Sequence, residues 1–210
     1  MLAAHVGSRL APSRRRALAV AAGLLALVSG LAAGAQGPTF RVERGDLRVT
    51  VPLKPGGAFE AKTASIAGAV TLGTGRPLPL TGDLSVDLAS IDTGIDLRNQ
   101  HLREKYLEIA KGPGFDKAVL SELRLNDADG EGFEGRTAFS GTLLLHGVRR
   151  PVSGTGEIHR AGRSVRVEGS FPLTLTDFAI EPPEYLGVGV ASRVLVRVQF
   201  VAAPAVGPGP

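Results

Sequence analysis

The sequence predicts a mainly β protein, an antiparallel barrel or sandwich of about eight strands, interrupted by one amphipathic helix. Apolar and polar residues alternate over most of the chain beyond residue 39, which is the period of a strand with two unlike faces. Clusters of Gly, Pro and Asp separate these segments, and one stretch instead carries apolar residues at helical spacing. Repeated short strands at such spacing are typical of barrels and sandwiches.

Residues 1–35 are expected to be a secretory signal peptide that precedes the domain. A segment with four arginines leads into an uncharged apolar run, and the small residues "AGA" at 33–35 resemble a signal-peptidase site. A membrane-anchoring helix is the alternative, because a span needs roughly 20 apolar residues. Cleavage near Ala35 would leave an exported protein, periplasmic or secreted. The segment "SRRRALA" resembles a twin-arginine signal only loosely, so the export route stays open.

The clearest strand is residues 164–175, where Val165, Val167 and Phe171 share one face and Arg166 lies on the other. The other seven expected strands are 40–51, 58–72, 83–88, 118–125, 136–145, 151–159 and 193–200. The predicted domain covers residues 36–203. Residues 204–210 lack periodicity and are expected to be a flexible tail.

The exception to the alternation is residues 97–111, which are predicted to form the helix. Asp96 is a candidate N-cap, and Gly112 follows the last turn. The apolar stripe is narrow, so the helix is expected to lie across one surface or the mouth of the sheet. That stripe consists of Leu102, Tyr106, Ile109 and Ala110.

Composition excludes several classes of function. Without the four leader arginines, the chain carries 20 basic and 20 acidic residues, so it has no electrostatic footprint for nucleic acid. The absence of cysteine excludes disulfides, thiol nucleophiles and zinc–thiolate sites. His101, His146 and His159 lack the spacing of a metal site, so neither a metal nor a cofactor is expected.

Catalytic signals are weak. Ser153 and Ser192 lack the setting of a nucleophile elbow, so a hydrolase or isomerase would have to use His101 or His146 with a nearby carboxylate. His146 stands in "LLLHGVRRPV" (143–152), which is typical of a hairpin corner. We expect His146 to anchor that turn by bonding to backbone or a carboxylate.

Two further residues fit the same corner. Gly147 supplies backbone freedom for the turn, and Pro151 is expected where the next strand begins, because proline donates no ladder hydrogen bond.

The expected barrel interior favours a cavity over a packed core. The chain has no tryptophan and two tyrosines, and its apolar faces consist mostly of Val, Leu, Ala and Gly. Such a lining suits an aliphatic chain. The alternative is a packed interaction module whose outer surface binds an envelope partner. The residues expected to contact a ligand tail are Leu84, Val86, Leu88, Phe139, Leu143, Leu145, Val167, Phe171, Leu173, Val196 and Val198.

Three stretches resemble the YceI-like family, exported bacterial proteins described as polyisoprenoid-binding. They are "SVDLASIDTGIDLRNQHLREKYLE" (85–108), "GTLLLHGVRRPV" (141–152) and "YLGVGV" (185–190). The resemblance implies a lipocalin-like, eight-stranded antiparallel barrel with a helix between strands. It also implies an isoprenoid or another amphiphile, such as a fatty-acyl lipid, as ligand, and no enzymatic activity.

Arg98 and His101 are the candidates for contact with a polar head group. They lie near the expected helix start, where backbone N–H groups and a cation favour anions. Helix capping and surface solvation are the alternative interpretation of both residues. Assembly as a homodimer stays open.

Overall fold

The structure is a computed structural model, which describes residues 37–130, 132–185 and 188–205. The expected signal peptide, its cleavage site and most of the expected tail lie outside the described residues. Within the described part of the chain, no helix is long and apolar enough to cross a bilayer.

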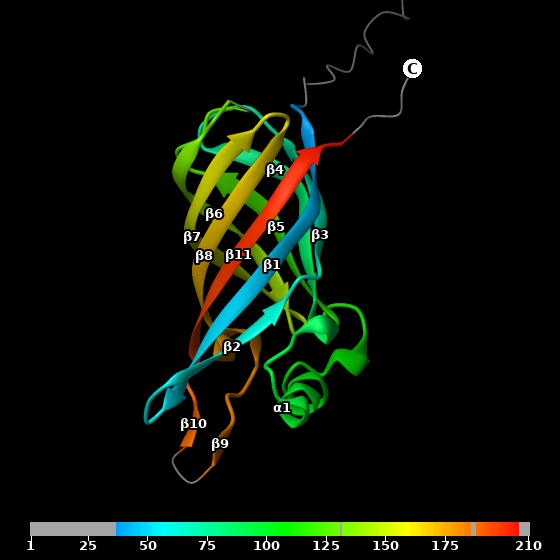
Figure 1. Ribbon diagram of the computed structural model, residues 1–210, viewed down its shortest axis with the longest axis vertical. Helices are drawn as coiled ribbons and strands as arrows, with labels where there is room; N and C mark the ends of the chain where they lie inside the picture. Colours follow the sequence, from blue (N-terminus) through cyan, green and yellow to red (C-terminus); the bar gives the residue numbers. More distant parts are fainter. Residues whose placement is uncertain (1–36, 131, 186–187, 206–210) are drawn as a thin grey trace, which may run out of the picture. The chain divides into compact units, whose positions relative to one another are not determined.

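Eight strands form a closed antiparallel barrel (Figure 1). In spatial order the ladder runs β11-β8-β7-β6-β5-β4-β3-β1, and β1 pairs with β11 to close it. The predicted fold is confirmed. The barrel strands are β1 (Thr39–Lys54), β3 (Ile66–Leu72), β4 (Leu78–Asp87), β5 (Lys117–Leu125), β6 (Gly135–Leu145), β7 (Val148–Ala161), β8 (Ser164–Thr174) and β11 (Arg193–Pro204).

The alternation of the sequence accounts for which face of each strand points inward. In β6, Phe139, Leu143 and Leu145 are buried, while the residues between them are partly exposed. In β8, Phe171 and Leu173 are buried in the same way. Because side chains alternate across a strand, these residues converge on the barrel interior.

The segment 58–72 was predicted as one strand, and the structure divides it in two. β2 (Ala58–Thr63) pairs with β1, whereas β3 pairs with β4 and with the start of β1. The Thr63 hydroxyl accepts a hydrogen bond from the backbone N–H of Ser65, which turns the chain between the two strands. The alternation of apolar and polar residues does not show this break, because apolar residues continue through it.

A short hairpin and two tight turns were not predicted as separate elements. The hairpin consists of β9 (Glu184–Tyr185) and β10 (Val188–Val190), and β10 pairs with the end of β1. The 3₁₀ turns η1 (Leu88–Ser90) and η4 (Leu175–Phe178) follow β4 and β8. These segments all lie at one end of the barrel.

The helix lies between β4 and β5 as predicted, but it is shorter than 97–111. α1 (Asp96–His101) continues through one π-helical turn, η2 (Leu102–Tyr106), giving a helix of 11 residues. Glu108 then adopts a left-handed conformation with φ 49°, which ends the helix, and η3 (Ile109–Lys111) is a separate 3₁₀ turn. The break thus places a non-glycine residue in a backbone conformation that glycine favours.

The prediction of Asp96 as N-cap is wrong. Ile95 precedes the helix, no side chain caps it, and Asp96 is the first helical residue. The helix start is instead held by Asn99, whose amide donates to Asp92 at 2.8 Å and whose oxygen accepts from the Thr93 backbone N–H at 2.8 Å. These bonds satisfy a buried amide and fix the first helical turn against the preceding loop.

The hydrogen bonds around Asp92 also affect its ionisation. Donation from Asn99, and then from the Gly94 backbone N–H, lowers the pKa of the Asp92 carboxyl below its ordinary value. The carboxylate is therefore the form that orders this loop.

Candidate ligand cavity

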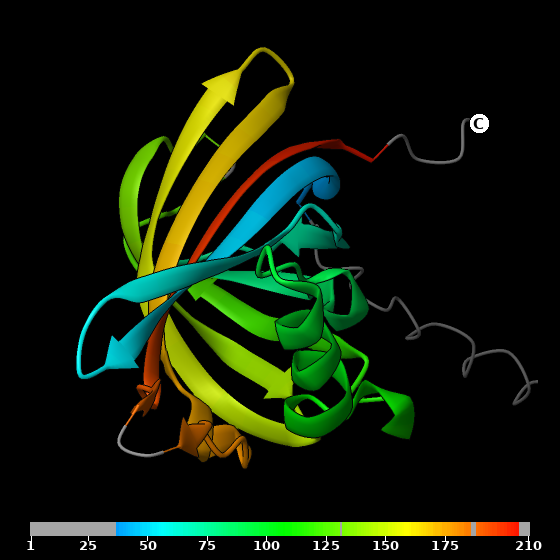
Figure 2. The same cartoon turned by 60° about the horizontal axis from the view of Figure 1, so that its bottom comes forward.

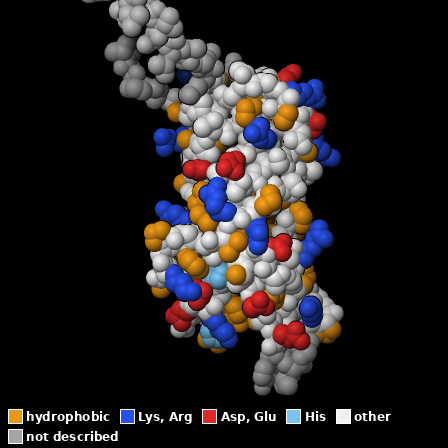
Figure 3. All heavy atoms as spheres, turned by 180° about the vertical axis from the view of Figure 1, so that it is seen from behind, with side chains coloured by type: hydrophobic (Ala, Val, Ile, Leu, Met, Phe, Trp, Pro, Cys, Tyr) orange, Lys and Arg blue, Asp and Glu red, His pale blue; other side chains and the backbone are white. Residues whose placement is uncertain are grey.

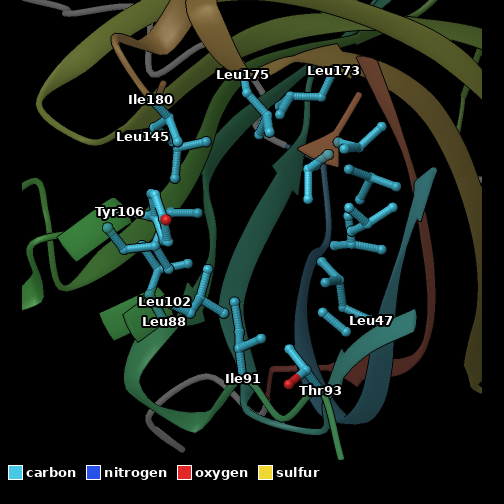
Figure 4. Close-up of a pocket in the computed structure, with 18 of the residues that line it drawn as sticks. Leu47, Leu88, Ile91, Thr93, Leu102, Tyr106, Leu145, Leu173, Leu175 and Ile180 are labelled. Atoms are coloured by element: carbon cyan, nitrogen blue, oxygen red, sulfur yellow. The ribbon is translucent and has the colours of Figure 1, made fainter. Parts of the chain in front are cut away.

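A cavity of about 950 Å³ occupies the barrel interior, and residues of the helix are among those that line it. Figure 2 shows this helix at one end of the barrel. The cavity opens at this end, and we call the opening the mouth, bounded by residues 91–107, 180–184 and 189–190. Figure 4 shows side chains from the helix, including Leu102 and Tyr106, facing Leu47 of β1 across the hollow. The volume lies within the range of small-molecule sites, about 300–1,000 Å³.

The structure brings nine of the eleven expected tail-contact residues to this cavity. They are Leu84, Val86, Leu88, Leu143, Leu145, Phe171, Leu173, Val196 and Val198. Phe139 and Val167 also point inward, but they line a second cavity of about 140 Å³ in the other half of the barrel. Leu84, Leu120, Val198 and Phe200 border both cavities and lie between them.

Sequence reasoning missed well over half of the apolar wall. β1 contributes Leu47, Val49 and Val51 in an alternation that the sequence does carry. The rest comes partly from other strands, such as β5 and β11, and partly from the helix and turns, which only the three-dimensional fold brings together. Further apolar lining residues are Phe59, Ala61, Ile66, Ile91, Leu102, Tyr106, Ala118, Leu120, Leu175, Ile180, Val190 and Val194.

The other half of the barrel, called the narrow half, is filled by aliphatic and aromatic side chains that leave a cavity of only about 140 Å³. Phe40, Phe133, Phe139 and Phe200 border its small cavity. Phe139 also meets Phe171 edge to face, with ring centroids 6.0 Å apart and an interplanar angle of 86°. Such contacts stabilise a core beyond its buried area. The hollow is therefore confined mainly to the half with the mouth.

Charged side chains gather at the mouth and not in its depth. Arg98, His101 and Lys105 line the helix side, and Glu181 and Glu184 line the segment before β10. No ion pair joins these groups among the described residues. Thus Arg98 and His101, the two head-group candidates, do lie at the rim.

Arg98 is held in place by an aromatic ring. Its guanidinium carbon lies 4.2 Å from the centroid of Phe59 in β2. A cation–π contact at this distance orients the side chain without neutralising its charge. Arg98 can therefore offer hydrogen-bond donors to a group at the mouth.

His146 links three segments at the rim of the barrel. Its Nδ1 lies 3.0 Å from the Phe178 carbonyl oxygen, and its Nε2 lies 2.9 Å from Glu108 Oε2. His146 and Gly147 have φ values of 51° and 74°, the two positive values of a type I′ turn between β6 and β7. The ring also meets Phe115 edge-on, with centroids 4.9 Å apart. Hereafter, the clamp means His146 with Glu108 and Phe178.

The clamp contains a histidine–carboxylate pair, but the pair lies outside the cavity lining. The pKa of Glu108 is lowered, first by the hydrogen bond from Lys111 at 2.7 Å and then by the bond from His146. His101 lines the cavity but makes no hydrogen bond to a carboxylate among the described residues. The described geometry thus offers no acid–base pair that faces the hollow.

Pro151 lies inside β7 and does not open it, because the strand begins at Val148. It pairs with Thr142 in a part of β7 that β8 does not reach, since pairing with β8 starts at Thr155. One side of the strand is free there, which is where a residue without N–H is tolerated.

The outer surface carries both signs of charge. Figure 3 shows basic and acidic side chains intermingled on one face of the barrel, with no region of a single sign. Within the described ranges, no group of three metal-ligating side chains comes together.

The fold and the site together define a closed, eight-stranded antiparallel barrel with an apolar cavity that opens at one end. The model of the YceI-like domain matches residues 41–202, and the chain belongs to the YceI-like family. No curated protein matches the chain significantly.

Two solved structures share the fold at low sequence identity. BcnA of Burkholderia cenocepacia is 16% identical, with a TM-score of 0.58, and the match covers 75% of this chain and 96% of that one. A polyisoprenoid binding domain from Saccharophagus degradans, implicated in plant cell wall breakdown, is also 16% identical. Its TM-score is 0.56, and the match covers 79% of this chain and 98% of that domain.

Proposed function

We propose that the protein is an exported, non-catalytic binding protein that holds a long-chain isoprenoid or similar amphiphile in the barrel. The observation that carries this proposal is the apolar cavity of about 950 Å³, whose charged groups are confined to the mouth. An amphiphile matches that division, with its tail in the barrel and its head at the rim. The polyisoprenoid-binding domain of similar fold supports this class of ligand.

The tail supplies the affinity in this proposal. Each methylene that leaves water contributes roughly 0.8 kcal/mol, so eight methylenes would contribute about 6 kcal/mol before the loss of entropy. Val86, Val196 and Leu173 belong to the wall that would bury them. Because this wall carries no charge, it selects for apolar length and not for one chemical pattern.

The head group would meet Arg98 and His101. Arg98 keeps its charge while it stacks on Phe59, so it can donate to a phosphate or carboxylate. Glu181 and Glu184 lie elsewhere on the rim, and an anionic head is therefore expected to lie on the helix side.

The two other functions considered are less well supported. A packed interaction module requires a filled interior, whereas this barrel is hollow over about 950 Å³. A hydrolase or isomerase requires a histidine–carboxylate pair facing the substrate, whereas the pair of His146 and Glu108 lies in the clamp, outside the cavity lining.

Native mass spectrometry of protein purified from its own cell envelope tests the proposal. We expect a non-covalent adduct of lipid mass on the mature chain, and the same spectrum reports whether cleavage occurs near Ala35 and whether the chain is a homodimer. Protein that is repeatedly empty and does not take up supplied isoprenoids or fatty acids would contradict it.

A further inference from the structure

Two apolar side chains at the mouth are exposed to solvent. Ile95 is 49% exposed and Leu97 is 61% exposed, and they are the exposed large hydrophobic residues of the described part of the chain. Both line the cavity at its opening. Isolated exposed apolar residues are common on proteins. Here, however, they are two residues apart and beside the entrance to the hollow. We call this pair the mouth edge.

The mouth edge does not serve the packing of the helix. The buried residue of α1 is Asn99, which binds Asp92 and Thr93, and Leu102 packs against the core one turn later. Ile95 and Leu97 belong to neither the buried core nor the residues packed against it. Their apolar surface is therefore available to a partner outside the barrel.

Basic side chains border the mouth edge. Arg98, His101 and Lys105 are spaced i, i+3 and i+7, so they share one face of the helix, and all three line the mouth. Long basic side chains can lie along an apolar surface and place their charge among lipid phosphates. The acidic residues Asp96 and Glu104 of the same helix do not line the mouth.

We propose that the mouth edge docks on an anionic lipid bilayer. Ile95 and Leu97 enter the interface, while Arg98 and Lys105 meet the head groups. The rim with Glu181 and Glu184 tilts away, since anionic lipids repel it. The cavity then opens toward the membrane, so that an apolar tail enters or leaves without crossing water. This role in exchange rests on the proposed function, whereas docking itself can be measured on the empty protein.

The first experiment uses the absence of tryptophan from the chain. Leu97→Trp provides a single fluorescent reporter at the mouth edge. Ala161→Trp provides the matched control, because Ala161 is exposed at the β7–β8 hairpin on the opposite end of the barrel (Figure 1). With vesicles of phosphatidylethanolamine and phosphatidylglycerol, we expect a blue shift of emission at position 97 and none at 161. No shift at 97, or equal shifts at both positions, overturns the proposal.

The second experiment measures sedimentation of the protein with the same vesicles and needs no reporter. We expect the double variant Ile95→Asn, Leu97→Asn to partition at least about tenfold less than the unmodified chain, because two apolar side chains no longer leave water. Ala161→Asn is expected to bind as the unmodified chain does. Circular dichroism verifies that each variant is folded.

Two outcomes separate this inference from the proposed function. Vesicle binding by a protein that never carries lipid would leave docking intact and contradict the carrier. Lipid-loaded protein that does not bind vesicles would leave the carrier intact and overturn docking. A blue shift at position 97 that grows with protein concentration in the absence of vesicles would assign the mouth edge to contact between copies of the chain, and it would overturn the proposal as well.

Discussion

The two halves of the barrel are built from the same strands but differ in what fills them. The half at the mouth, called the wide half, surrounds a cavity of about 950 Å³, whereas the other half leaves a cavity of only about 140 Å³. β6 runs through both, with Phe139 in the narrow half and Leu143 in the wide half. The same strands therefore enclose a large hollow at one end and a nearly filled interior at the other.

The comparison teaches that the same alternation of residues can leave either a small or a large hollow along one barrel. In the narrow half, aliphatic side chains and four phenylalanines leave about 140 Å³. In the wide half, the side chains leave about 950 Å³, and residues 91–107 border the opening without filling it. The capacity for a ligand is consequently concentrated at one end of the strands.

The largest expected effect is on stability in the narrow half. Phe139→Ala removes a ring from a packed region, and such truncations cost about 3–5 kcal/mol. Leu143, four residues along the same strand, borders a hollow that already exists. The loss of stability in Leu143→Ala is therefore expected near the lower limit for truncation of a leucine, about 2 kcal/mol. Urea unfolding of the two variants without ligand measures the difference.

The same pair of variants should show the opposite order in ligand affinity. Leu143→Ala removes part of the wall of the main cavity, and Phe139→Ala does not. If Phe139→Ala weakened binding of a fatty acid as much as Leu143→Ala, the tail would extend into the narrow half and the division between the halves would be wrong.

The next effect concerns the wide half alone. Val86→Arg places a cation against the tail, and we expect uptake of a fluorescent fatty acid to fall about 30-fold or more, because apolar chains do not solvate a charge. Arg166→Glu, an outward-facing change on β8, is the control and should leave uptake unchanged. Equal effects of the two changes would mean that the inner and outer faces are assigned wrongly.

The smallest effect lies in the clamp that holds the rim of the wide half. The pKa of Glu108 is lowered from its ordinary value of 4.5, first by Lys111 and then by His146. A carboxyl with a lowered folded pKa stabilises the fold above its unfolded pKa, and this contribution is lost as the pH falls through the folded value. Glu108→Gln should therefore be less stable than the unmodified chain at pH 7, and the gap should close below pH 4.5.

Urea midpoints at several pH values between 3 and 7 measure that gap. Lys111→Met removes the partner that lowers the pKa of Glu108 most, while it keeps His146 in place. In that background the loss of stability caused by Glu108→Gln at pH 7 should be smaller but not zero. A constant gap across the range would show that Glu108 acts through its left-handed backbone and not through its charge.

The barrel was readable from the sequence because inward and outward residues alternate in β6, β8 and β11. Nine of the eleven residues expected from the sequence to contact a ligand tail line the main cavity. The division into two cavities did not follow, since Phe139 and Leu143 have the same parity and differ only in height along the barrel. Likewise, no local pattern shows that Glu108, His146 and Phe178 meet, because Phe178 lies 32 positions and Glu108 38 positions from His146 in the sequence.

The helix shows a different limit. Its existence followed from spacing, whereas its ends depend on tertiary contacts. Asn99 is buried because it completes a network with Asp92 and Thr93, and helical propensity alone gives no sign of that role. The bond from the Leu107 N–H to the Leu102 carbonyl makes the last turn wider than an α-helix.

The pairing of β1 with β11 also limits when the barrel can close during folding. Phe40 lies opposite Pro204 and Thr50 opposite Leu195. The first strand of the barrel can therefore complete its pairing only when the last strand is available. Until residues 193–204 are free to pair, the sheet has two open edges, which are the parts of a β protein that aggregate. A chain that emerges residue by residue, from a ribosome or through a membrane, would therefore seal this barrel only after residues 193–204 have emerged.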